Sequence, residues 1–411
     1  MNQLSLFLPC AAGVEDFLAQ EVHALTGRSG QDLLTLRGGV RVAADWREAL
    51  QLNLHSRLAQ RVLIELAHAP YRNENDLYAI ASGVAWEIWF TPKQTFKIET
   101  TAQHSPLTSL NFATLRIKDA IADRFRAKAN GVRPSIETQW PDARVFAHLA
   151  TDQCTLYIDT SGEPLFKRGW RQDKGDAPLK ETLAAAMLAA SGWWNPETRE
   201  VSSAALYDPC CGSGTIAIEA AQIALGIPAG SQRRFGFEKL LPFQPHVWDA
   251  LKAASMPDTS SQEEAQAQAI FGSDVSHRMV DFSARNAERA GVAAAVQFRG
   301  GDALQRMPPA EAGVMMLNPP YGERIEVGGI AGEGRGREDA QTEDGGEFFV
   351  QLASHWKKNY AGWTAWILSP DMKLPGAMRL KESRRVPMWN GPIECRLFRF
   401  DMVAGSARDK V

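Results

Sequence analysis

The sequence of 411 residues has few of the features that mark metal-binding, secreted or membrane proteins. It has five cysteines, of which only Cys210 and Cys211 are adjacent, and it has no C-x-x-C pair of the kind that binds zinc or an iron–sulfur cluster. It has no long uncharged apolar run, and residues 1–8 lack the basic region and the length of a signal peptide. We therefore expect reduced thiols, no metal site, no membrane segment and a cytoplasmic location.

The sequence also lacks a large excess of positive or negative charge. The formal net charge is −3, and residues 1–175 contain 20 basic and 19 acidic residues. Composition therefore does not indicate a nucleic-acid partner, and any surface that binds RNA must be local. The length exceeds that of one ordinary domain and fits two or three.

The most informative local sequence follows the apolar run at residues 314–317, which predicts a strand ending in Asn318-Pro319-Pro320-Tyr321. The side-chain oxygen of Asn318 and the carbonyl of Pro319 can accept hydrogens from the exocyclic amine of a nucleobase. The two prolines stiffen the turn, and Tyr321 can stack on the base. By itself, the same tetrapeptide is equally typical of a proline-rich turn without a function.

A second pattern lies upstream. An apolar run at residues 204–207 is followed by Asp208, a glycine-rich turn, and a stretch rich in Ala and Ile, which predicts a strand, a turn and a helix. Gly212 and Gly214 allow a tight turn and a close approach to a ligand. Position 217 is Ala where a dinucleotide fold has its third glycine, and no Lys-Ser or Lys-Thr pair of a P-loop follows. The pattern favours a methionine-derived methyl donor over a nicotinamide cofactor.

Two further acidic residues follow predicted strands. Asp274 comes after residues 269–273 and can accept from both hydroxyls of a ribose, and Asp302 comes after residues 296–298 and can accept from an adenine amine. A single carboxylate of this kind is more often a helix cap or part of a solvated turn. The four strand ends together, in this order, predict one ligand site.

These residues resemble the successive motifs of class I S-adenosylmethionine-dependent methyltransferases, and in particular the THUMP-domain RNA guanine-N2 methyltransferases that act on bacterial 23S ribosomal RNA. Residues 166–171 and 177–185 resemble the segment that leads into that family's catalytic domain, and residues 390–397 resemble its closing hairpin. Some family members carry a second, fused methyltransferase domain. Because the sequence stops at Val411, we expect only the first activity.

The resemblance implies an α/β fold with a doubly wound, Rossmann-like methyltransferase domain in residues 166–411. A ferredoxin-like α+β module in residues 1–64 and a THUMP RNA-binding domain in residues 65–165 would precede it. It also implies S-adenosylmethionine as cofactor, ribosomal RNA of the large subunit as partner, and a monomer in preference to an oligomer. The implied catalytic residues are Asn318, Pro319, Pro320 and Tyr321, and the implied cofactor-binding residues are Asp208, Cys210, Gly212, Ser213, Gly214, Thr215, Asp274 and Asp302.

Two basic segments are candidates for RNA contact. Lys167, Arg168 and Arg171 lie where the two halves of the sequence join, and Arg233 and Arg234 precede several aromatic residues in an insertion. Single-stranded RNA is bound by such mixtures of cationic and aromatic side chains. The alternatives are a solvated linker for the first segment and, more commonly, a subdomain that packs its own aromatic residues for the second. A glycine-rich stretch, residues 328–346, is either a lid or a solvated loop.

Periodicity predicts further elements. In the first half we expect strands at residues 4–8 and 95–101, a hairpin of residues 145–149 and 154–159, and helices over residues 14–25, 45–66 and 110–128. In the second half we expect a helix over residues 279–290, a central strand at residues 364–368, an antiparallel hairpin that includes residues 393–400, and Trp193, Trp194, Trp363 and Trp366 in the core.

The sequence therefore predicts methyl transfer from S-adenosylmethionine to the N2 amine of a guanosine in 23S ribosomal RNA. Three alternatives stay open: the same reaction on transfer RNA, adenine-N6 methylation of DNA, and a non-catalytic RNA-binding or ribosome-assembly protein. The front region and the extension Gly322-Glu323-Arg324 favour RNA and guanine. The complete set of donor residues favours an enzyme.

Overall fold

The computed structural model describes residues 3–175, 178–255, 269–319 and 345–403. The chain divides into two compact units, each with its own sheet. The first unit comprises Met1–Cys10, Glu21–Leu165 and Gly230–Ser255, and the second comprises Ala11–Gln20, Phe166–Ala229 and Met256–Val411.

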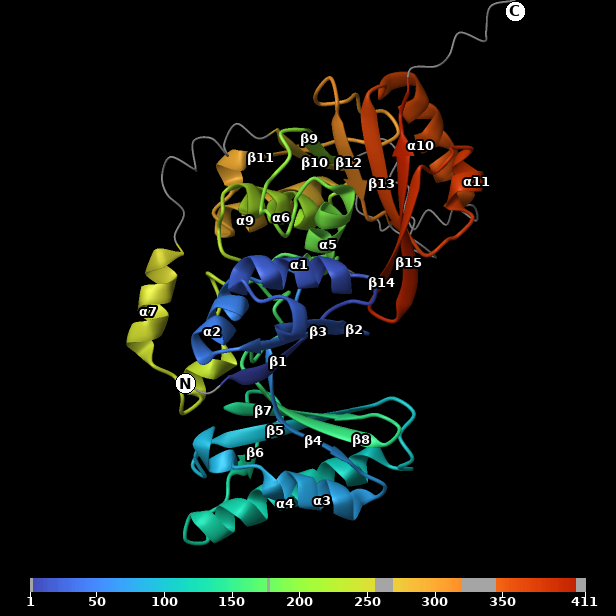
Figure 1. The fold of residues 1–411 in the computed structure, drawn as a ribbon. Coiled ribbons are helices and arrows are strands. Elements are labelled where there is room, and N and C mark those ends of the chain that lie inside the picture. The colour runs from blue at the N-terminus through green and yellow to red at the C-terminus, as the bar shows by residue number, and fades with distance from the viewer. Residues whose placement is uncertain (1–2, 176–177, 256–268, 320–344, 404–411) are drawn as a thin grey trace, which may run out of the picture. The chain divides into compact units, whose positions relative to one another are not determined.

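The first unit is built on an eight-stranded sheet in the order β2-β3-β1-β4-β8-β7-β5-β6. Because β1 pairs with β4, the sheet continues from the first 64 residues into those that follow. Helices α3 and α4 lie together on one face of the sheet (Figure 1). The strands are β1 (Leu4–Pro9), β2 (Leu33–Leu36), β3 (Gly39–Ala44), β4 (Leu63–Pro70), β5 (Thr95–Ala102), β6 (Ser135–Ile136), β7 (Ala143–Leu149) and β8 (Gln153–Asp159). The helices of this unit are α2 (Trp46–His55), α3 (Glu74–Gly83), α4 (Leu110–Lys128) and α7 (Pro245–Ala254), while the residues of α1 (Glu15–Thr26) are divided between the two units.

Most predicted elements of the first half are confirmed, including the helix over residues 110–128 and the hairpin of β7 and β8. The helix predicted over residues 45–66 is too long. Asp45 and Glu48 form a capping box that fixes the start of α2, but the helix ends at His55. The carboxylate of Glu21 accepts hydrogen bonds from the Ser56 hydroxyl and from the next two backbone N–H groups, so the chain leaves the helix there.

The insertion that carries Arg233 and Arg234 packs its own aromatic residues. This was the alternative to an RNA-binding surface in the sequence analysis. Phe235 and Phe237 stack with ring centroids 5.0 Å apart, and Trp248 meets both rings edge-on. All three side chains are buried. Residues 230–255, expected within the catalytic domain, group with the first unit instead.

The second unit contains a seven-stranded sheet in the order β11-β10-β9-β12-β13-β15-β14. The first five strands are parallel, and β15 runs antiparallel to both β13 and β14. This arrangement confirms the predicted doubly wound α/β fold with an antiparallel closing hairpin. The strands are β9 (Ala205–Asp208), β10 (Ile270–Asp274), β11 (Val296–Gly300), β12 (Gly313–Leu317), β13 (Trp363–Ser369), β14 (Arg384–Asn390) and β15 (Ile393–Asp401).

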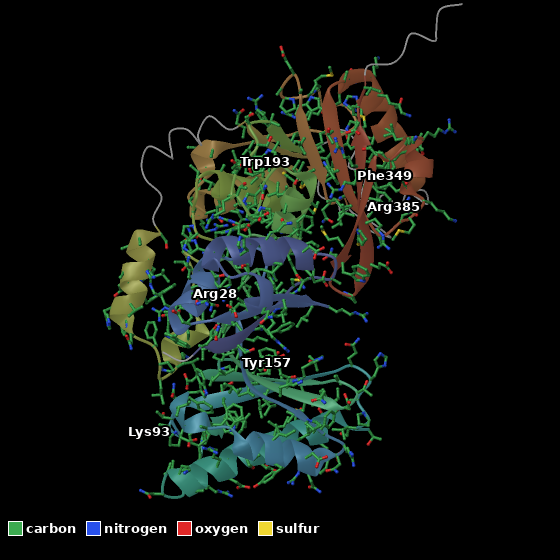
Figure 2. The ribbon with its side chains drawn as sticks, viewed as in Figure 1. Arg28, Lys93, Tyr157, Trp193, Phe349 and Arg385 are labelled. Atoms are coloured by element: carbon green, nitrogen blue, oxygen red, sulfur yellow. The ribbon has the colours of Figure 1, made fainter. Side chains whose placement is uncertain are left out.

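Helices cover both faces of this sheet (Figure 1). On one face α10 packs through Trp356 into a core with Tyr207 and Trp363, which confirms the predicted burial of the latter. On the other face lie the helices that follow β9 and β10. Trp193, labelled in Figure 2, is also buried and donates its indole N–H to the carbonyl of Ala204 at 2.9 Å. The helices are α5 (Glu181–Ser191), α6 (Thr215–Ala224), α9 (His277–Arg289), α10 (Gly345–Asn359) and α11 (Leu374–Met378).

Candidate functional site

The polar residues predicted at strand ends lie along one edge of the second sheet. Strand β9 lies between β10 and β12, and all three are parallel. Asp208 pairs with Gly272 of β10, so Asp274 lies just beyond it along the neighbouring strand. Asn318 directly follows β12 on the other side. The strand order reverses between β9 and β12, and ligands of open parallel sheets bind outside the carboxyl ends of the strands at such a point.

The glycine-rich turn between β9 and α6 has the backbone conformation that its glycines allow. Gly212 has φ +52° and Gly214 has φ +85°, both in the left-handed region. A Cβ atom at Gly214 would also lie 3.0 Å from the ring of Phe298 and 3.1 Å from Ser283. A Cβ atom at Gly212 would meet nothing within 4 Å. The turn is therefore packed on the side of Gly214 and leaves space for a ligand at Gly212.

Neighbouring elements hold this turn in place. The backbone N–H of Gly212 donates to Asp274 Oδ2 at 2.9 Å, and the N–H of Cys211 donates to the carbonyl of Ser273 at 2.9 Å. The Ser283 hydroxyl, on α9, donates to the carbonyl of Gly212 at 2.7 Å. Asp274 thus shapes the turn, a role that the sequence did not predict.

The site is acidic. The pKa of Asp208 is raised to about 8, mainly by burial and to a smaller extent by the nearby Asp274 carboxylate, while the hydrogen bond from the Cys210 N–H opposes the shift. Burial also raises the pKa of Asp274, although the N–H groups of Ser276 and Gly212 bind its carboxylate and oppose the shift. Two carboxyl groups in one partly dry site are suited to a ligand that brings positive charge or hydrogen-bond donors.

The two adjacent cysteines are part of the turn rather than nucleophiles. Burial, with a smaller effect of the neighbouring carboxylates, raises the pKa of the Cys210 and Cys211 thiols well above its usual range. A thiol is reactive as the thiolate, so both groups are inert at neutral pH.

The raised pKa of Asp208 makes the stability of the protein depend on pH. The folded protein keeps this carboxyl protonated up to pH about 8, whereas the unfolded chain releases the proton near the ordinary value of 3.8. Its contribution to stability is therefore complete below about pH 4 and is lost as the pH rises toward 8. Urea unfolding of the wild type and of Asp208→Asn across this range should show a shallower decline in the variant. Parallel pH profiles would contradict the assignment. The raised pKa of Asp274 also makes stability depend on pH, and this contribution is present in both the wild type and Asp208→Asn.

Arg171 braces the turn from the segment that precedes α5. Its guanidinium donates to the Ser213 hydroxyl at 2.6 Å, to the Thr215 hydroxyl at 2.7 Å and to Glu181 Oε1 at 2.8 Å. The Arg171 side chain is 12% exposed and that of Glu181 is 3% exposed. We therefore correct the hypothesis of an RNA contact for Arg171, because its guanidinium donates hydrogen bonds to other residues of the protein. Sequence reasoning missed this positioning role, since the acceptors lie far along the chain.

Two other arginines require the same correction. Arg168 is 1% exposed, and its Nε lies 3.0 Å from Glu219 Oε1, which is fully buried. Arg233 donates to the backbone carbonyls of Ser161, Glu163 and Pro164. These contacts assign both side chains to local structure. Of the five basic candidates, Lys167 and Arg234 are the exposed ones.

The structure describes three of the remaining candidate site residues, Asp302, Asn318 and Pro319. Asp302 is half-buried and accepts the backbone N–H of Leu304 at 2.9 Å, as a turn-forming residue does. Asn318 is half-buried and Pro319 is buried. Pro320 and Tyr321, and residues 328–344 of the glycine-rich stretch, lie outside the described residues.

One residue beside the site was missed by the sequence interpretation. Val275 directly follows Asp274 and is 43% exposed. An apolar side chain left exposed beside a polar strand end can contact the flat face of a bound ring. The signal in the sequence was an apolar residue immediately after an acidic strand end.

The fold and this edge site define the class of the second unit as an α/β methyltransferase. The family model described as the RMKL-like methyltransferase domain matches residues 168–399, which is more than half of the chain. The chain belongs to this family. A THUMP domain model matches residues 71–159, and a model described as the RlmL ferredoxin-like domain matches residues 5–63.

Curated relatives have similar sequences. The ribosomal RNA large subunit methyltransferase K/L of Psychromonas ingrahamii is 35% identical over 397 residues, which cover 96% of this chain and 50% of the relative. The protein of that name from Shewanella pealeana is 35% identical over 407 residues, which cover 98% of this chain and 54% of the relative. The chain thus spans about half the length of these relatives.

Solved structures share the fold. SMU.472, a candidate methyltransferase in complex with SAH, has a TM-score of 0.82 and 24% identity, and the match covers 99% of this chain and 100% of that one. A Listeria monocytogenes protein, assigned by prediction as an N6-adenine-specific DNA methylase, has a TM-score of 0.81 and 26% identity over 97% and 96% of the two chains. Within the described residues no helix is long and apolar enough to cross a membrane, and no three His, Cys, Asp or Glu side chains group as metal ligands.

Proposed function

We propose that this protein transfers a methyl group from S-adenosylmethionine to the exocyclic N2 amine of a guanosine in 23S ribosomal RNA. One observation supports the proposal most strongly. Asp208, Asp274 and Asn318 lie at the carboxyl ends of neighbouring parallel strands, where the strand order reverses. The relatives named as large subunit methyltransferases and the match to a THUMP domain support RNA as the substrate. A cytoplasmic location and the absence of a metal requirement would follow from this reaction.

The residues around the glycine-rich turn fit the proposed cofactor. The turn leaves open space at Gly212, and the carboxyl groups of Asp208 and Asp274 can accept hydrogen bonds from the ammonium group and the hydroxyls of the ligand. When bound, S-adenosylmethionine supplies an electrophilic methyl group. Asp274 would accept from the ribose hydroxyls and Asp302 from the adenine amine. The turn residues Cys210, Gly212, Ser213, Gly214 and Thr215 would line the cofactor.

The end of β12 would position the base. The lone pair of an exocyclic amine is delocalised into the ring, so the amine needs oriented acceptors to react. The Asn318 side-chain oxygen and the Pro319 carbonyl would accept its two hydrogens and direct the remaining electron density toward the donor. Pro320 would hold the turn and Tyr321 would stack on the base. A base in a duplex would first have to be flipped out, at a cost of about a few kcal/mol.

Replacement of Asp274 tests the cofactor site. Asp274→Ala should weaken binding of S-adenosylmethionine by at least about tenfold, because a charge-assisted hydrogen bond contributes roughly 1.5–3 kcal/mol. The loss of its bonds to Gly212 and Ser276 should add to the effect. Calorimetric titration measures the dissociation constant directly. Asp281→Ala, which removes an exposed carboxylate on α9, is the matched control and should bind as the wild type does. An unchanged constant in Asp274→Ala would remove this residue from the site.

A further inference from the structure

The second unit has a cavity of about 220 Å³ on the face of strands β10 and β11. Phe271 and Gln297 line it from the strands, and Met307 and Pro308 line it from the following loop. Two arginines, Arg299 and Arg306, complete the polar part of the lining. Tyr207 and Gly272, on the strands that end at Asp208 and Asp274, also line the cavity, whereas Asp208, Asp274, Asp302 and Asn318 do not.

The cavity lies where no helix of the described residues covers the sheet. The chain between β11 and β12, residues 301–312, forms turns and irregular structure instead of a crossover helix. Strand β11 is an edge strand, and its Gln297 and Arg299 are two residues apart, so their side chains lie on one face. Both side chains are exposed. The loop passes over this face and forms the opposite wall.

The lining carries two positive charges and no carboxylate. Within the described part of the chain, Arg299 forms no ion pair, and Arg306 donates one hydrogen bond, to the carbonyl of Gly300 at 2.9 Å. The backbone of Arg306 is fixed, since its carbonyl accepts from the Tyr360 hydroxyl at 2.8 Å and lies 2.7 Å from His355 Nε2. Two guanidinium groups at one cavity repel each other, and an anion between them relieves that repulsion. Each keeps donors of the fork geometry that fits phosphate oxygens.

We propose that this cavity binds a backbone phosphate of the RNA substrate through Arg299 and Arg306. The aromatic and apolar wall, with Phe271 and Met307, then contacts the adjoining sugar or base. This inference rests on the proposed function, because it takes the anion to be part of an RNA chain. A phosphate contact here adds affinity and fixes the direction of the strand without reading its sequence.

Arg299→Ala tests the site, because the side chain is exposed and its loss leaves the core intact. Binding of a 23S ribosomal RNA fragment is measured over a series of salt concentrations. We expect weaker binding at low salt and a decrease of about 0.7–1 in the slope of log K against log salt, the change that one lost phosphate contact gives. Arg299→Lys keeps the charge and should keep most of the slope. Arg384→Ala, an exposed arginine on the opposite edge strand β14, is the control and should behave as the wild type.

The dissociation constant for S-adenosylmethionine should be the same in all these variants. Wild-type affinity and slope in Arg299→Ala would overturn the phosphate site. The proposed function is judged separately, by the methylated product of the wild-type protein. If the wild type methylates guanosine while Arg299→Ala binds RNA normally, the cavity assignment alone is wrong. If Arg299→Ala loses the contact but the wild type makes no methylguanosine, the site stands and the proposed reaction falls.

Discussion

Replacement of Asn318 by alanine is expected to lower kcat by a factor on the order of 10² or more. The substitution removes an acceptor that would orient the guanine amine at the end of β12. It leaves the glycine-rich turn and the acidic residues of β9 and β10 in place, so the dissociation constants of S-adenosylmethionine and of RNA should change little. Single-turnover methyl transfer to a guanine-containing RNA fragment measures the chemical step without contributions from product release.

Asn318→Asp is the matched comparison, because it keeps an acceptor oxygen and adds a charge. It should retain measurable activity, well above that of Asn318→Ala. A rate equal to that of the wild type in the alanine variant would mean that Asn318-Pro319-Pro320-Tyr321 is only a turn. A large loss of cofactor affinity in the same variant would instead place Asn318 in the cofactor site.

The second large effect concerns stability. Arg168→Ala should lower the free energy of unfolding by about 3–5 kcal/mol, because it breaks a buried ion pair by removing one of its two partners. Urea unfolding followed by fluorescence measures this loss. The exposed Lys358, on α10 of the same unit, is the control, and Lys358→Ala should be close to the wild type in stability.

A double replacement separates charge from packing at this pair. Arg168→Met with Glu219→Leu removes both charges together and should recover much of the lost stability, since an apolar pair of similar volume can replace a buried ion pair. Wild-type stability in Arg168→Ala, together with weaker binding of RNA, would contradict the burial of this side chain. It would restore the earlier hypothesis of an RNA contact.

The local patterns of the sequence predicted what depends on local structure. The apolar runs before Asp208, Asp274 and Asn318 become parallel strands, and strands of one direction bring their carboxyl ends to a common edge. The apolar runs thus predicted strands that are parallel neighbours in the sheet. The resemblance to the methyltransferase family predicted the antiparallel hairpin of β14 and β15, which closes the sheet.

The roles of the arginines could not be read from the sequence, because their partners are distant along the chain. Arg168 pairs with Glu219, 51 positions away, and Arg171 bonds Ser213, 42 positions away. A cluster of basic residues looks the same whether it faces solvent or buried acceptors. The helix predicted over residues 45–66 failed for a related reason, since Glu21 binds the backbone after His55 from another part of the chain.

The most direct test of the account is the identity of the methylated nucleoside. The protein is incubated with S-adenosylmethionine carrying a labelled methyl group and with 23S ribosomal RNA from a strain that lacks this activity. The RNA is then digested and analysed by mass spectrometry. The account predicts label in N2-methylguanosine, and none when Asn318→Ala replaces the wild type under single-turnover conditions. Label in N6-methyladenosine, or transfer to transfer RNA but not to 23S ribosomal RNA, would contradict the proposed substrate. No label in any nucleic acid would contradict the proposed reaction.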